Sequence, residues 1–197
     1  MKTKILIFTA FFTLTFSNAQ DLFPTNQYNL NTSKSVLSWY GNSLFQFNEH
    51  HGTVQFKKGY LKIQDGKLWG GSFEVDMTTI TAKDGGANSE LDKHLKNEDF
   101  FDVKKFPTAW LSIQKVKHID NGKYEIEANL NIKGITKPVL FGAELLPEGT
   151  TWKFTAKLII DRTRWEINYG SNEGVMDPLR NYSISDAIKF DVMIITD

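Results

Sequence analysis

Cysteine is absent from the chain. That absence excludes disulfides, thiolate metal ligands, a cysteine nucleophile and the lipid attachment of a diacylated lipoprotein, so the fold must be stabilised by core burial alone. An excess of charge of one sign is also missing, because 23 basic residues balance 23 acidic ones. A balanced charge gives no electrostatic reason to expect nucleic acid as a partner.

Long apolar runs are missing except at the start. Lys2 and Lys4 precede residues 5–16, which are apolar apart from three threonines, and Ser17-Asn18-Ala19 follow. This arrangement is typical of a secretory signal peptide cut after Ala19. The alternative, a membrane anchor, is disfavoured because the run is shorter than the ~20 residues that span a bilayer. We therefore expect a signal peptide at 1–19, one exported domain at 20–197 in the periplasm or the medium, and no transmembrane segment after cleavage.

What the chain does have is apolar and polar alternation with a period of two. Residues 124–133 alternate throughout, and residues 73–78, 111–114, 152–160 and the start of 188–195 repeat the pattern. Such alternation predicts β-strands with one buried face. Asp65-Gly66, Asn121-Gly122, Gly134 and Gly149 separate the runs, and these signals predict tight antiparallel hairpins. Val54 and Phe56 differ in parity from Leu61 and Ile63, which predicts a β-bulge at residues 57–59.

One segment predicts a helix. Ser89 has the character of an N-cap, with acidic Asp92 three residues later, and the helix should run to about Asn97 with Leu91 and Leu95 on one face. About eight strands, short turns and one helix in a longer connection favour an all-β fold, a closed antiparallel up-and-down barrel. A two-sheet sandwich is the alternative. A barrel of eight strands is filled by its side chains or holds one ligand.

Three stretches resemble the YceI-like family of bacterial envelope proteins, known as polyisoprenoid-binding and lipocalin-like. They are His94 to Val103 followed by Lys105-Phe106-Pro107-Thr108, then Leu130 to Val139, then Ile160 to Trp165. The resemblance extends from about Tyr28 to the end of the chain. It implies a lipocalin-like barrel with an apolar tunnel, a periplasmic location and a bound polyisoprenoid or other long-chain lipid. Lys34 stands where the family has a histidine, so we expect the mouth of the barrel to differ.

Inward-facing residues on the alternating strands are the candidates for a tunnel lining. The alternative is that they pack against one another, but small residues at Ala128, Ala143 and Ala156 leave space. The candidates are Phe73, Val75, Leu111, Ile113, Tyr124, Ile126, Ala128, Leu130, Phe141, Ala143, Phe154, Ala156 and Leu158.

Two groups near the ends of the predicted barrel have candidate roles. Phe100 and Phe101 follow the helix and are expected either to gate the tunnel or to anchor the helix as core. Arg162, Arg164 and Trp165 are a candidate contact for a lipid headgroup, since arginine binds pyrophosphate through charged hydrogen bonds. The alternative there is a turn closed by an Asp161–arginine pair.

Motifs for catalysis or metal binding are not found. His50 and His51 are adjacent and point to opposite faces of a strand, and no nucleophile motif or phosphate loop is present. We therefore expect no catalytic residues, no metal and no cofactor besides a bound lipid. The expected function is binding, storage or transport of a lipid such as a polyisoprenoid or a fatty-acid derivative, in a monomer or homodimer. The alternatives are an envelope-stress barrel with a filled interior that binds a partner, and an enzyme acting on a hydrophobic substrate.

Overall fold

The computed structural model describes residues 26–43, 49–84, 89–171 and 184–197, so the predicted signal peptide lies outside the described residues. The elements are β1 (Asn26–Asn29), β2 (Val36–Ser43), β3 (Glu49–Gln64), β4 (Lys67–Ala82), α1 (Glu90–Lys96), β5 (Thr108–Asp120), β6 (Lys123–Ile132), β7 (Ile135–Glu148), β8 (Thr151–Asp161), the 3-10 helix η1 (Arg162–Trp165) and β9 (Ile184–Ile195). Within the described ranges, no helix has the length and apolarity that a membrane crossing requires.

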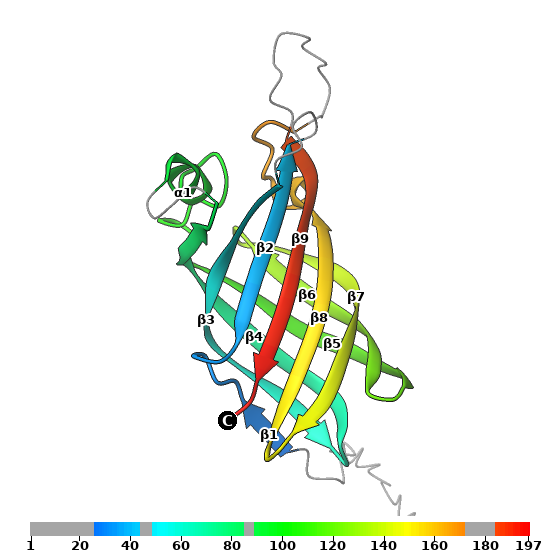
Figure 1. Ribbon diagram of the computed structural model, residues 1–197. Coiled ribbons are helices and arrows are strands. Elements are labelled where there is room, and N and C mark those ends of the chain that lie inside the picture. Colours follow the sequence, from blue (N-terminus) through cyan, green and yellow to red (C-terminus); the bar gives the residue numbers. More distant parts are fainter. Residues whose placement is uncertain (1–25, 44–48, 85–88, 172–183) are drawn as a thin grey trace, which may run out of the picture.

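Strands β2 to β9 form a closed barrel (Figure 1). Each pairs antiparallel with the next strand in sequence, and β9 pairs with β2 to complete the ring. The predicted eight-stranded up-and-down barrel is confirmed, and the sandwich alternative is wrong because strand pairing continues around the whole ring. The additional strand β1 pairs with Tyr60–Ile63 of β3, beyond the part of β3 that β2 covers.

The predicted turns and the bulge are present. Asp65-Gly66 and Asn121-Gly122 all have positive φ angles, between 42° and 78°, as two-residue primed hairpin turns require. The register of β3 with β4 shifts between Phe56 and Lys58. This shift lets Val54 and Phe56 before it, and Leu61 and Ile63 after it, all face the interior. A Cβ at Gly59 would lie only 2.7 Å from Cδ1 of Phe73, so this bulge depends on glycine.

The helix α1 lies at one end of the barrel (Figure 1). The Ser89 side chain caps it by accepting from the Asp92 amide, as predicted. The Asp92 carboxylate is buried and accepts from the Ala82 amide at 2.6 Å and from the Thr81 hydroxyl at 3.0 Å. Because both partners belong to the end of β4, the carboxylate holds α1 over the barrel end.

The opposite end of the barrel interior is filled. Side chains there are almost inaccessible, and the Tyr124 hydroxyl accepts from the Leu68 amide at 3.2 Å. Residues with 0–2% exposure at this end include Leu61, Ile63, Tyr124, Ile126 and Ile194. Lys34 lies in the turn between β1 and β2, at this filled end and away from α1, so its effect on the mouth of the barrel stays a prediction.

Candidate ligand-binding cavity

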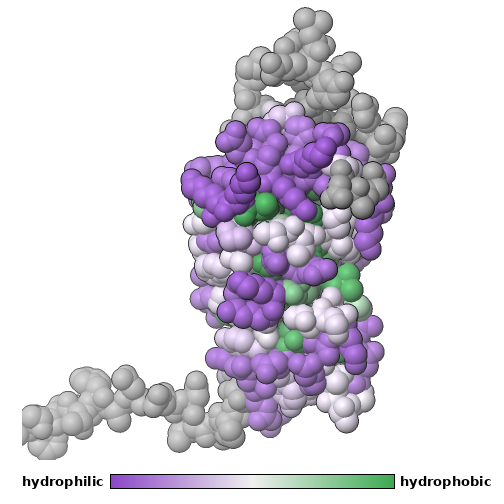
Figure 2. Space-filling view, turned by 90° about the vertical axis from the view of Figure 1, so that its left-hand side faces the viewer, coloured by the Kyte–Doolittle hydropathy of each residue, from purple (hydrophilic) through white to green (hydrophobic). Residues whose placement is uncertain are grey.

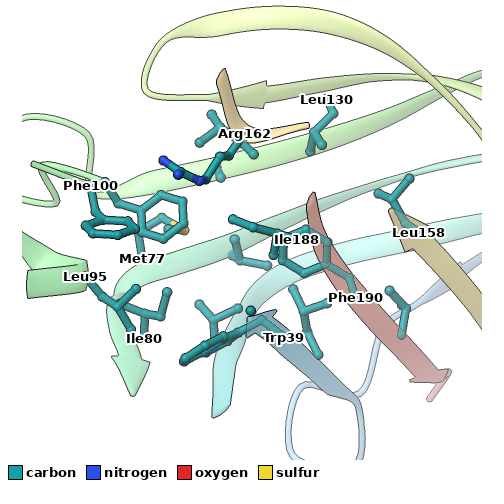
Figure 3. A pocket seen from close by; sticks show the side chains of 18 of the residues that line it. Trp39, Met77, Ile80, Leu95, Phe100, Leu130, Leu158, Arg162, Ile188 and Phe190 are labelled. Atoms are coloured by element: carbon teal, nitrogen blue, oxygen red, sulfur yellow. The ribbon is translucent and has the colours of Figure 1, made fainter. Parts of the chain in front are cut away.

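The half of the barrel beneath α1 is hollow. It contains a cavity of about 460 Å³ to which all eight barrel strands contribute side chains (Figure 3). Arg162 and Leu130 lie on one side of it and Ile80 and Trp39 on the other. This volume falls within the roughly 300–1,000 Å³ of small-molecule sites.

The cavity changes in polarity along its length. Its deep part is bounded by apolar side chains, among them Leu37, Phe154 and Val192, where β2, β8 and β9 approach the filled end. The polar lining residues all belong to the ends of strands near α1 and η1, or to those two helices and the segment after η1. They are Asn42, His50, His94, Arg162, Tyr169 and Ser185. The arrangement suits an amphiphile whose tail enters first.

Eight of the thirteen predicted lining residues face the cavity. They are Phe73, Val75, Leu111, Leu130, Phe141, Phe154, Ala156 and Leu158. The other five lie off the cavity: Ile113, Tyr124, Ile126, Ala128 and Ala143. Parity indicates whether a side chain points inward, but not how deep it lies along the barrel. Four of the five are fully buried towards the filled end, and Ile113 is only partly buried.

Much of the cavity wall consists of residues that were not predicted from the sequence. Strands β2 and β9 were not among the predicted lining, yet they contribute Leu37, Trp39, Ile188, Phe190 and Val192. Met77 continues the inward alternation of Phe73 and Val75 and also lines the cavity. Leu91 and Leu95 share one face of α1, and that face points into the cavity. These signals were available in the sequence.

Phe100 and Phe101 form part of the wall directly after α1. They are 7% and 6% exposed, and the Phe101 amide donates to the Leu95 carbonyl at 3.2 Å. The Phe100 ring centroid lies 5.6 Å from that of Tyr169, which also lines the cavity. Both rings therefore stand at the mouth, where a role in gating stays a prediction.

Arg162 is fully buried and lines the cavity. Its guanidinium donates to the main-chain carbonyls of Ser185, Ile167 and Ile184 and lies 3.2 Å from an Asp186 oxygen. Burial lowers the pKa of Arg162 from its ordinary value, while the carboxylates of Asp186 and Asp161 act in the opposite direction. The guanidinium therefore ties η1 to the start of β9.

The other two residues predicted to contact a headgroup, Arg164 and Trp165, lie off the cavity. Arg164 is exposed and donates to the Pro138 carbonyl at 3.0 Å, while Trp165 is buried and donates to the Leu130 carbonyl at 3.3 Å. Asp161 caps η1 by accepting from the Thr163 amide and hydroxyl. The carboxylate 3.2 Å from Arg162 is that of Asp186, not that of Asp161.

Two histidines stand at the mouth. His50 Nδ1 lies 2.5 Å from an Asp84 oxygen, and His94 Nδ1 lies 3.8 Å from an Asp99 oxygen. Burial is the largest single influence on Asp84 and acts to raise the pKa of its carboxyl group. The hydrogen bonds from His50 and from the His51 amide act in the other direction, and the net result is a lowered pKa. Within the described part of the chain, no cluster of three or more histidine, aspartate or glutamate side chains has the arrangement of a metal site.

Known proteins are similar to part of this sequence. A UPF0312 protein of Shewanella denitrificans is 36% identical over 104 residues, which are 53% of this chain and 50% of the relative. One of Azotobacter vinelandii is 31% identical over 99 residues, half of each protein. The matched segments thus span about half the length of these curated relatives.

Solved structures show the same barrel. Burkholderia cenocepacia BcnA superposes with a TM-score of 0.69 at 19% identity, covering 85% of this chain and 99% of BcnA. The Campylobacter jejuni YCEI protein gives 0.55 at 16%, covering 94% and 92%. At these identities the likeness establishes the fold. The YceI-like domain itself matches residues 28–195. The chain therefore belongs to the YceI-like family.

Proposed function

We propose that this protein binds the apolar tail of a long-chain lipid inside the barrel and stores or transports it. The observation that carries the proposal is the cavity of about 460 Å³ with an apolar deep part, built by all eight strands. Each buried methylene contributes about 0.8 kcal/mol, so about ten methylenes contribute roughly 8 kcal/mol before the ordering costs of association. A preformed wall lowers those costs.

The shape of the site supports a long apolar tail of more than one lipid class. An apolar wall distinguishes hydrocarbons mainly by length and branching, so a polyisoprenoid and a fatty-acid derivative both fit its chemistry. The resemblance in the sequence favours the polyisoprenoid. The polar residues at the mouth support a position of the lipid head beside α1.

We further propose that the protein acts after export and without catalysis. The apolar run at residues 5–16, with its basic start and small residues before position 20, supports export to the periplasm or the medium. Two polar side chains at the mouth already have partners: Arg162 binds carbonyls and His50 binds Asp84. That supports binding over an enzyme acting on a hydrophobic substrate. Pairing of two copies stays a prediction, which sedimentation velocity tests.

The alternative of a barrel with a filled interior, acting through its outer surface, has support from the packed end alone. The side of the molecule shown in Figure 2 is largely hydrophilic with scattered apolar residues. A partner-binding barrel needs no cavity, whereas half of this interior is hollow.

Native mass spectrometry of the full chain, expressed with its own first 19 residues and purified without detergent, tests the proposal. The expected result is a fraction of protein carrying one lipid, released as the collision energy rises. Protein free of lipid that also takes up no long-chain alcohol, ester or prenol when these are added would refute the proposal.

The same assay tests a gate. Replacing Phe100 and Phe101 with alanine should speed release of a bound lipid, because both rings stand at the mouth. Unchanged uptake and release rates with an intact fold would leave the two rings as anchors of α1 only.

A further inference from the structure

The indole of Trp39 carries a polar atom without a partner. Trp39 is 6% exposed and lines the cavity, and its buried Nε1 has no hydrogen-bond acceptor among the residues that the structure describes. A buried tryptophan N–H ordinarily finds a partner, because leaving it unpaired is unfavourable. An unpaired donor on the wall of a ligand-sized cavity points to an acceptor on the ligand.

Open space lies next to this indole. Gly41 is two residues further along β2, so it shares the inward face of Trp39, and it also lines the cavity. A Cβ at Gly41 would meet no atom within 4 Å. The indole itself is fitted against Gly52 of β3, where a Cβ would lie 2.7 Å from its Cζ2 atom. Nε1 is shielded from water in this structure, so contact with a ligand oxygen requires the indole to turn towards the space at Gly41.

The charge of the lining restricts the kind of oxygen. Among the described residues that line the cavity, Arg162 is the only lysine or arginine, and no aspartate or glutamate is present. The Arg162 guanidinium already donates to three carbonyls and lies 3.2 Å from Asp186. An ionised head inside the mouth would lose its hydration without a free counter-charge, which is strongly unfavourable.

We propose that Trp39 donates a hydrogen bond to an uncharged oxygen of the lipid, in a hydroxyl, carbonyl or ether group, held beside Gly41. The tail then extends towards Leu37 and Val192. This inference rests on the proposed function and adds to it that the ligand is an uncharged oxygen-bearing amphiphile, not a pure hydrocarbon or a lipid anion.

A series of C16 ligands tests the inference by displacement of the neutral probe N-phenyl-1-naphthylamine from delipidated full-length protein. Hexadecan-1-ol should bind more tightly than hexadecane and than hexadecyl phosphate. Trp39→Phe should weaken the alcohol by about 3- to 10-fold, the effect of one hydrogen bond, and leave hexadecane unchanged. Trp69→Phe, at an outward position that is 60% exposed, is the matched control and should change neither affinity.

Each other outcome has a definite meaning. Tightest binding of the phosphate, or equal losses of alcohol and alkane in Trp39→Phe, would overturn the inference while the proposed function stands. Failure of every ligand to bind wild-type protein would defeat the proposed function and this inference with it. If Trp39→Phe does not fold, the indole N–H resonance of Trp39 in the wild-type protein decides. It should shift downfield with the alcohol and not with the alkane, and an unchanged resonance would overturn the inference.

Discussion

Two alanines on the inner face of the barrel should respond in opposite ways to the same substitution. Ala156 lines the cavity, whereas Ala128 is 2% exposed and lies towards the filled end. Leucine at either position adds three carbon atoms. At position 156 these atoms occupy space that the lipid tail would take. Displacing three methylenes weakens binding by about 2.4 kcal/mol, which raises the Kd roughly 50-fold.

Stability should be lost in the variant at position 128 and kept in the variant at position 156. Ala128→Leu forces atoms into a packed region and should destabilise the protein by about 1–3 kcal/mol, a fall of about 2–4 °C in Tm per kcal/mol. Ala156→Leu should leave Tm unchanged or raise it, because its side chain enters existing space. Probe displacement with a C16 alcohol measures affinity, and thermal unfolding of ligand-free protein measures stability. Equal destabilisation by both substitutions, with unchanged lipid affinity in both, would refute the distinction between a hollow and a filled half.

Three further predictions concern polar groups. Arg162→Met should lower the free energy of unfolding by about 3–5 kcal/mol in urea titrations, because three carbonyls lose their donor and Asp186 its counter-charge; a loss below 1 kcal/mol would contradict this. Asp92→Asn should speed lipid exchange in stopped-flow probe displacement by loosening α1 from Ala82, and an unchanged rate would count against α1 as a cover. Hydrogen bonding to Lys57 lowers the pKa of Glu74 below its ordinary 4.5, so its stabilising effect is present above that value and lost as pH falls through the folded-state pKa. Glu74→Gln should therefore lose less stability than wild type on acidification, and parallel losses would exclude the linkage.

Much of the barrel could be predicted from local sequence. Alternation identified the buried faces because side chains along a strand alternate strictly, and Asn121-Gly122 predicted a turn because those positions need positive φ angles. The bulge at residues 57–59 followed from a change in parity alone. Such features depend on residues close together in the chain.

The depth of the cavity depends on contacts that local sequence does not reveal. Ala128 and Ala156 have the same local pattern, yet they lie in different halves of the interior because the strands tilt around the barrel. Arg162 resembled a headgroup contact, but its role is set by carbonyls and a carboxylate more than twenty residues away. The unpaired Nε1 of Trp39 likewise becomes visible only when its surroundings are known.

The central claim is that a lipid tail occupies the hollow half of the barrel. Two neutral methyl esters of stearic acid, with a nitroxide near the head or near the tail end, test it directly by NMR of the full chain. The account predicts that the tail nitroxide broadens the methyl resonances of Leu37 and Val192 most strongly, and that the head nitroxide broadens those of Leu91 and the ring resonances of Tyr169. Broadening confined to outward residues such as Leu140 and Ile159, or none at all, would contradict it.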